Sequence, residues 1–191
     1  MGSYLFTNVR ILDGSGAPAY PGEVLVQGNR ITRVGPAGVG RMMPTTGIAV
    51  IDAAGATLMP GITESHTHFS WNNAASLDGI QVMPPEEHTL WAAHVAKKYL
   101  EHGWTSCVGA AAAKPRLDIV IRNAIESGQV PGPRYMAASQ EITVQGSLGD
   151  ETLPHIQYPE YNFGAVVSGP EEMRRTVRMF LKYGVDTIKV N

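Results

Sequence analysis

Two neighbouring histidines are the residues of this chain whose type and spacing most directly indicate chemistry. His66 and His68 stand two positions apart, shortly after a Pro-Gly break at residues 60–61. If this stretch is a strand, side chains at i and i+2 point to one face, and the two Cα atoms lie roughly 7 Å apart. Two imidazoles at that spacing can hold one ion of zinc or a neighbouring metal, and an open coordination position activates water. By itself, the pattern also fits a polar strand end or a surface hairpin.

Lys189 is the second residue of interest, because Ile188 and Val190 flank it in a short predicted strand that Val185 opens. Charged side chains are seldom buried unpaired in a strand that is covered on both faces. Burial favours the neutral amine, which is the reactive form. A neutral lysine amine can add carbon dioxide to form a carbamate, whose two oxygens can bridge two metal ions. The alternative interpretation is an exposed strand end.

Composition and charge exclude several classes of function. The formal net charge is −2 and no basic block occurs, so nothing indicates binding to nucleic acid or to an anionic membrane surface. No apolar run approaches the length of a membrane span, and the N-terminus lacks the pattern of a secretion signal. We therefore expect a cytoplasmic protein. The single cysteine, Cys107, excludes an intrachain disulfide and is expected to be a buried, inert thiol.

Residues 1–58 are expected to form a small β domain. Short runs of β-branched and aromatic residues alternate with Gly- and Pro-rich stretches, and a Gly-Asn pair at 28–29 predicts a tight hairpin. Short strands at close spacing are typical of a β-sandwich, or of part of one.

Residues 59–191 change to an alternation of strands and helices. Predicted strands at 104–108, 134–139 and 185–190 follow the strand that carries the histidines, and a capping box at 168–171 starts the last helix. This order is typical of parallel strands in an α/β fold, either a doubly wound sheet or a (β/α)8 barrel. No G-x-G-x-x-G follows the first strand, so a Rossmann-type nucleotide site lacks its signature. In a barrel, catalytic groups lie at the C-terminal ends of the strands, where strands one and four would carry the histidines and Lys189.

Five stretches of the sequence resemble the N-terminal part of metal-dependent amidohydrolases, in the branch of imidazolonepropionase-like and Xaa-Pro dipeptidase-like enzymes. They are NVRILDG at 8–14, GNRI at 28–31, MPGI at 59–62 leading into HTH at 66–68, IESG with PGPR at 125–134, and GVDTIKV at 184–190. Each stretch is modest alone, but the five occur in order and cover essentially the whole chain.

The resemblance implies a TIM-type (β/α)8 barrel, of which about the first four strands are present, with part of a small N-terminal β-sandwich. It also implies one or two divalent metal ions, zinc first, with cobalt, manganese or iron as alternatives. His66 and His68 match the ligands on strand one, and Lys189 matches the carboxylated lysine that bridges a binuclear centre. Glu64 departs from the family pattern, because an aspartate usually stands two residues before the first histidine. We assign it no role.

The same resemblance implies that part of the active site is missing from this chain. A barrel needs about 250 residues, whereas roughly 130 follow Pro60. Two further histidine ligands and a general-base aspartate are expected beyond Asn191. We therefore expect a fragment or one piece of a split protein, completed by a second polypeptide or a C-terminal part, and a homo-oligomer when complete.

Other polar residues are weaker candidates. Three positions in predicted loops could contact the substrate: Trp71, Asn72 and His155. Histidines of the first helix have spacings that favour solvated or packing roles: His88, His94 and His102.

Three functional hypotheses remain open from the sequence. The first is hydrolysis of an amide-like C–N bond by metal-bound hydroxide, in a dipeptide, an N-acyl amino acid, a carbamate or a urea. The second is deamination at a single metal, against which the presence of Lys189 argues. The third is a non-catalytic fragment that binds a partner polypeptide or a metal.

Overall fold

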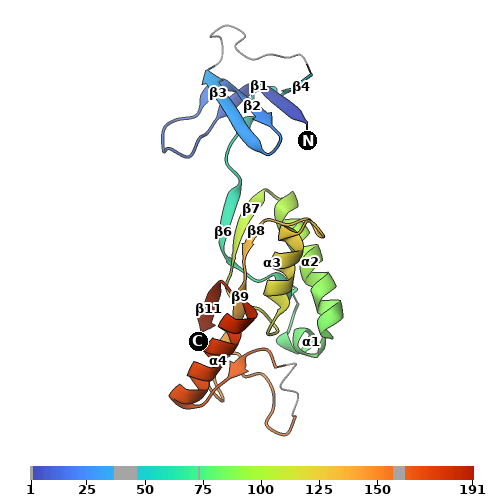
Figure 1. The fold of residues 1–191 in the computed structure, drawn as a ribbon, viewed down its shortest axis with the longest axis vertical. Helices are drawn as coiled ribbons and strands as arrows, with labels where there is room; N and C mark the ends of the chain where they lie inside the picture. Colours follow the sequence, from blue (N-terminus) through green and yellow to red (C-terminus); the bar gives the residue numbers. More distant parts are fainter. Residues whose placement is uncertain (1, 37–46, 73, 157–161) are drawn as a thin grey trace. The chain divides into compact units, whose positions relative to one another are not determined.

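The computed structural model describes residues 2–36, 47–72, 74–156 and 162–191 (Figure 1). The chain forms two compact units, Met1–Pro60 and Gly61–Asn191. The predicted domain assignment, 1–58 and 59–191, stays a prediction. In the described part of the chain, no helix is both long enough and apolar enough to cross a membrane.

In its described residues, the first unit contains five strands in one sheet. They are β1 (Ser3–Ile11), β2 (Tyr20–Gln27), β3 (Arg30–Pro36), β4 (Ala49–Asp52) and β5 (Thr57–Leu58). The first three pair antiparallel, whereas β4 and β5 both pair parallel with β1. The predicted hairpin at 28–29 is confirmed between β2 and β3, where Gly28 has a φ of 62°. All described strands of this unit belong to this sheet, so the second layer of a sandwich is not among them.

The second unit alternates strands with helices. Its strands are β6 (Ile62–Thr67), β7 (Trp104–Gly109), β8 (Arg134–Met136), β9 (Ala138–Thr143), β10 (Ala165–Val166) and β11 (Thr187–Val190). Its helices are η1 (Phe69–Trp71), α1 (Leu77–Val82), α2 (Pro85–Glu101), α3 (Leu117–Glu126) and α4 (Gly169–Tyr183).

Every strand pair in this second unit is parallel, with the orders β6-β7-β8 and β10-β9-β11. Only Ala137 separates β8 from β9, so the main strands run β6, β7, β8 with β9, and β11, joined by helical segments. The predicted alternation is confirmed, and the arrangement is that of the first half of a (β/α)8 barrel. The strand predicted at 134–139 is corrected: it breaks at Ala137 and then reaches Thr143.

Helix α2 packs on this sheet through small residues. Ala92 and Ala96 are buried in one cluster with Phe69, Cys107 and Ile121, because an alanine face lets the helix backbone approach the sheet closely. Leu90 of the same helix is 75% exposed and Trp91 is 45% exposed, whereas Val95 and Tyr99 are partly buried against this cluster. The expected burial of Cys107 is confirmed.

Helix α4 begins differently from the predicted capping box. Ser168 is the N-cap residue, but its side chain makes no capping bond. Its backbone N–H donates instead to Glu172, at 2.5 Å, while Glu171 pairs with Arg174. Strand β10 lies in the long connection between β9 and α4, of which residues 157–161 lie outside the described part.

Candidate metal centre

The two histidines of the H-x-H motif meet at the C-terminal end of β6. His66 is the fifth residue of the strand, and His68 follows its last residue, Thr67. Thr67 is buried on the opposite face, which places both imidazoles on the same side. Their Nε2 atoms lie 3.1 Å apart. His66 is exposed and His68 is half-buried.

A backbone carbonyl fixes the orientation of the His68 ring. Nδ1 of His68 lies 3.1 Å from the carbonyl oxygen of Ala111, in the loop after β7. A carbonyl only accepts, so Nδ1 carries the proton and Nε2 presents its lone pair towards His66. The indole of Trp71 stacks on the same ring, with centroids 3.8 Å apart and planes inclined by 22°. Contacts on the edge and on the face therefore hold this imidazole in place.

The electrostatic environment keeps His68 neutral. Burial lowers its pKa below the usual 6.5, and the nearby charges of His66 and Lys189 lower it further, against the opposing effect of the Ala111 carbonyl. Neutral imidazole is the form that binds a metal.

The two nitrogens fit a shared metal ion. Zinc–nitrogen bonds of 2.0–2.1 Å at a tetrahedral angle place two ligand nitrogens about 3.3 Å apart. The observed separation of 3.1 Å is close to this value. The donor set is incomplete within the described residues, which contain no group of three or more His, Cys, Asp or Glu side chains suited to a metal.

Lys189 lies at the same end of the partial barrel. It is half-buried in β11, and its backbone N–H donates to Oγ of Ser139 at 3.0 Å. Its charge acts on the pKa of His68, so the amine lies within electrostatic reach of that ring. Lys189 is thus within electrostatic reach of His68, and its role as a bridging ligand stays a prediction.

A hollow of about 610 Å³ opens beside the histidines, and we call it the histidine hollow. It is lined by His66, His68, Trp71, Asn72, Leu77 and Ile80 on one side and by α2 residues including Trp91 and His94 on the other. Two of the three predicted substrate contacts, Trp71 and Asn72, therefore face it. His94, for which sequence reasoning favoured packing or solvation, faces it as well.

Two other predicted positions lie elsewhere. His155 is exposed in the loop between β9 and β10 and is not among the residues that line the histidine hollow. Glu64 accepts a hydrogen bond from the backbone N–H of His66 at 3.1 Å, and it lines a smaller neighbouring hollow of about 280 Å³.

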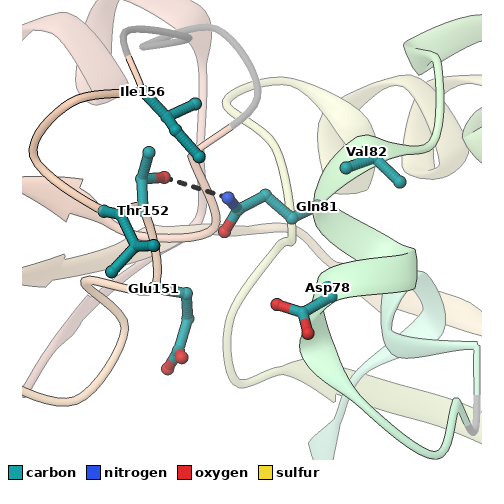
Figure 2. A pocket seen from close by; sticks show the side chains of 7 residues that line it. Asp78, Gln81, Val82, Glu151, Thr152 and Ile156 are labelled. Carbon is teal, nitrogen blue, oxygen red and sulfur yellow. Dashed lines mark hydrogen bonds between the residues drawn. The ribbon is translucent and has the colours of Figure 1, made fainter.

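A separate hollow of about 560 Å³ lies between α1 and the β9–β10 loop, and we call it the outer hollow. In Figure 2, Asp78, Gln81 and Val82 project from α1 towards Glu151, Thr152 and Ile156 of the loop. Nε2 of Gln81 donates to Oγ1 of Thr152 at 3.0 Å across this space. Helix α1 therefore stands between two hollows, with Leu77 and Ile80 facing one and Gln81 facing the other.

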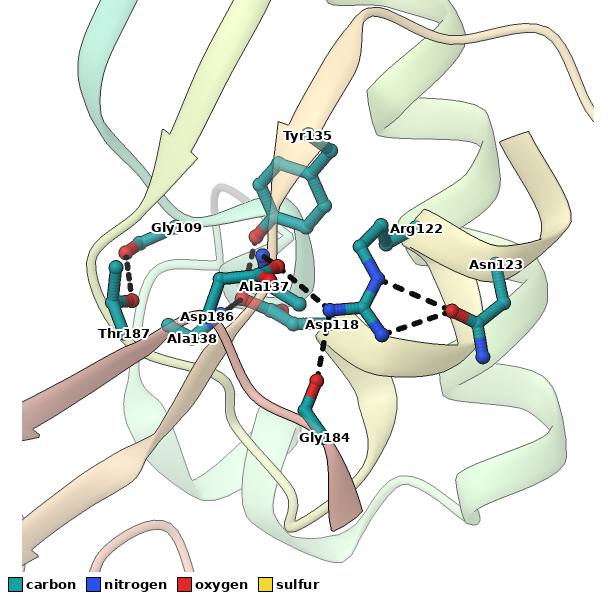
Figure 3. A network of polar contacts seen from close by, with 10 residues as sticks. All are labelled: Gly109, Asp118, Arg122, Asn123, Tyr135, Ala137, Ala138, Gly184, Asp186 and Thr187. Carbon is teal, nitrogen blue, oxygen red and sulfur yellow. Dashed lines mark hydrogen bonds and ion pairs between the residues drawn. The ribbon is translucent and has the colours of Figure 1, made fainter. Parts of the chain in front are cut away.

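Two carboxylates brace the strands that carry the C-terminal side of the site (Figure 3). At the break between β8 and β9, Asp186 accepts from the N–H of Ala137 at 2.7 Å, and Asp118 accepts from the N–H of Ala138 at 3.2 Å. Arg122 pairs with Asp186 at 2.7 Å. Because Asp186 lies just before β11, these bonds fix the start of the strand that carries Lys189.

Asp118 is fully buried and also accepts from the hydroxyl of Tyr135 at 2.5 Å. Burial raises the pKa of Asp118 to about 7, although its two hydrogen bonds oppose the shift.

With this geometry established, the comparisons with known proteins define the class. The amidohydrolase family model matches residues 57–191, and the chain belongs to this family. Among curated proteins, it is 37% identical over 65 residues to N-acyl-D-aspartate deacylase of Alcaligenes xylosoxydans xylosoxydans, a match covering 34% of this chain and 12% of the relative.

Solved structures share the fold over almost the whole chain. An amidohydrolase crystal structure matches with a TM-score of 0.79 and 26% identity, covering 98% of this chain and 46% of the other. A prolidase complexed with N-methylphosphonate-L-proline matches with a TM-score of 0.82 and 24% identity, with the same coverages. The chain thus spans about half the length of these structures, and its barrel fold is confirmed.

Proposed function

We propose that this chain contributes one half of the active site of a metal-dependent hydrolase that cleaves amide-type C–N bonds. The observation that carries the proposal is the pair of Nε2 atoms 3.1 Å apart, with the lone pair of His68 directed by the Ala111 carbonyl. Membership of the amidohydrolase family supports the reaction class.

In this proposal, His66 and His68 hold one divalent ion, with zinc as the first choice because two neutral imidazoles suit it. When bound, the ion supplies Lewis-acid activation of water and of the carbonyl group. The neutral amine of Lys189 would bond through its nitrogen to the carbon of CO₂ and release a proton, and the carbamate so formed would supply two oxygens as metal ligands. Trp71 keeps the His68 ring in one plane.

The proposed substrate class is supported by the relatives and by the lining of the histidine hollow. The relatives include a prolidase, an Xaa-Pro dipeptidase, a phenylurea hydrolase and an N-acyl-D-aspartate deacylase. Trp71, Leu77 and Ile80 give the hollow an apolar wall. We therefore propose a dipeptide, an N-acyl amino acid, a carbamate or a urea with an apolar group next to the scissile bond.

The remaining ligands and the general base are proposed to come from the other half of the barrel. Within the described residues, β6 pairs only with β7, and β11 only with β9, so each has an edge on which a further strand can pair. A second polypeptide or a C-terminal extension that supplies these strands would complete the site.

The decisive experiment measures hydrolysis by the completed, zinc-loaded protein against Xaa-Pro dipeptides, N-acyl amino acids, carbamates and ureas. We expect turnover that chelator abolishes and zinc restores. Lys189→Ala should lose activity, and added short carboxylates should restore part of it by replacing the carbamate. Full activity of Lys189→Ala without such carboxylates would refute the bridging role, and a stoichiometry of one metal with deaminase activity would refute the hydrolase.

A further inference from the structure

Helix α1 is too short and too poorly capped to be stable by itself. It has six residues, its N-cap residue Ser76 makes no side-chain capping bond, and Gly79 stands in its interior. Isolated helices of this length are marginal in water, and glycine in a helix costs about 1 kcal/mol relative to alanine. Tertiary contacts must therefore decide where α1 lies.

The position of α1 matters because the helix separates the histidine hollow from the outer hollow. Ile80 is buried against Ala113, Leu117 and Phe163, which gives the helix an apolar anchor. Apolar contact is not directional, so it does not by itself set the position of the helix along its axis.

Lys114 supplies a directional contact. Its side chain is almost completely buried, with 2% of the residue exposed, and it reaches the C-terminal turn of α1. Nζ donates to the carbonyl oxygens of Ile80 at 3.3 Å and Gln81 at 3.0 Å. An ammonium group at the C-terminus of a helix is favoured by the helix dipole, and charged donors make the stronger hydrogen bonds. Burial lowers its pKa to about 8, which leaves it mostly protonated at neutral pH.

The backbone next to Lys114 holds the histidine motif. We call residues 110–114 the brace loop. In this loop, the N–H of Ala110 donates to the carbonyl of Thr67 at 2.9 Å, and the carbonyl of Ala111 orients His68. The N–H of Ala113 donates to Oγ of Ser70 at 2.8 Å. One segment of five residues therefore contacts β6, His68, η1 and α1 in turn.

His88 reinforces the same region from α2. It is completely buried, and its Nε2 lies 2.5 Å from the carbonyl oxygen of Ser70. Burial lowers its pKa, and the charge of Lys114 lowers it further, so His88 donates this bond as a neutral imidazole. The two buried groups therefore do not repel each other as a pair of cations.

We propose that Lys114 is a positioning residue: it ties α1 to the brace loop, and thereby sets the distance between the apolar wall of the histidine hollow and the His68 ring. The consequence for substrate binding rests on the proposed function, whereas the link that Lys114 makes between α1 and the brace loop does not. Removal of the ammonium should release α1 while β6, β7 and the His66–His68 pair stay in place.

The test compares Lys114→Met with Lys97→Met, an identical change at an exposed lysine of α2 whose ion pair with Glu101 is solvated. Amide hydrogen exchange should accelerate at least tenfold in residues 77–82 of Lys114→Met, with little change in β6 and β7. The indole N–H resonance of Trp71 should shift, and those of Trp91 and Trp104 should not. Unchanged exchange in α1, or equal acceleration across the whole unit, would overturn the proposal.

A second pair of measurements keeps the proposal testable if Lys114→Met does not fold. In the unmodified protein, the Lys114 ammonium should give a slowly exchanging NH₃⁺ resonance with nuclear Overhauser contacts to Ile80 and Gln81. Absence of this resonance would refute the proposed contact between Lys114 and α1. Ile121→Val, a core change in the separate cluster around Phe69, shows whether mild general destabilisation alone releases α1.

Kinetics then separate this inference from the proposed function. In the completed enzyme, Lys114→Met should raise KM at least fivefold with a smaller change in kcat, and it should leave zinc affinity within about twofold. A fall in kcat with unchanged KM would contradict the positioning role. Absence of hydrolysis by the unmodified enzyme would refute the proposed function. The hydrogen-exchange result for residues 77–82 would still test the contact between Lys114 and α1.

Discussion

The chemistry of the site depends on which nitrogen of His68 carries a proton. The carbonyl of Ala111 accepts from Nδ1, and this single contact leaves Nε2 free to bind a metal. The proton position is therefore set by backbone geometry in the next βα loop and not by the H-x-H motif itself.

The first prediction concerns His68 as a proposed metal ligand. His68→Asn should lower zinc affinity by at least tenfold, because a ligand with a fixed lone pair is lost. His102→Asn is the matched control, since His102 is exposed and, among the hydrogen bonds described, its ring bonds only to the carbonyl of Lys98. Zinc titration with a competing chromophoric chelator measures the zinc affinity of both variants. Equal affinity in the two variants would remove His68 from the ligand set.

The second prediction concerns Asp118, whose pKa of about 7 lies above the ordinary 3.8. The folded state then holds a proton that the unfolded state releases between these values, so this group makes the free energy of unfolding fall as pH rises from about 4 to 7. The change is roughly 4 kcal/mol for three pKa units. Asp118→Asn should remove this slope, as urea denaturation at pH 5 and pH 8 would reveal. The same pH dependence of the free energy of unfolding in the unmodified protein and in Asp118→Asn would contradict this prediction.

At the scale of elements, the glycines distinguish loosely held segments from tightly packed ones. A Cβ added at Gly79 in α1 meets no atom within 4 Å, whereas one added at Gly109 at the end of β7 meets Asp118 Oδ2 and Tyr135 Oη at 2.7 Å. The helix is therefore free to accept a methyl group, and the strand end is not.

The third prediction follows from this difference. Gly79→Ala should stabilise the protein by about 0.5–1 kcal/mol, because alanine has the higher helix propensity and the space is open. Gly109→Ala should destabilise it by about 1–3 kcal/mol, because the methyl group forces apart a buried hydrogen-bonded pair. Denaturant midpoints measure both. Similar effects of the two substitutions would show that the local packing differs from that described.

At the scale of the whole molecule, the open strand edges govern behaviour in solution. Val190 is 53% exposed on β11, whose described pairing is confined to β9. Unpaired edges promote association, and a lysine placed on an edge strand opposes it.

The fourth prediction is that the purified 191-residue chain associates, and that Val190→Lys weakens this association at least fivefold. Leu181→Lys is the control, because Leu181 is 57% exposed but belongs to helix α4 and not to a strand. Sedimentation velocity over a concentration series reports the result. A cooperatively folded monomer at every concentration would refute both this prediction and the proposed need for a second half of the barrel.

The sequence by itself determined the alternation of strands and helices and the placement of His66 and His68 on one face of a strand end, because periodicity and spacing are local properties of the chain. The strand context of Lys189 marked this residue as well, and resemblance then supplied its predicted role and the family that the comparisons confirm. Only the tertiary structure decided the tautomer of His68, the break at Ala137, the alanine face of α2 and the burial of Lys114. The alanine face depends on apolar side chains of other segments, and the other three depend on backbone carbonyls or carboxylates from distant segments. Such partners leave no periodic trace in the sequence.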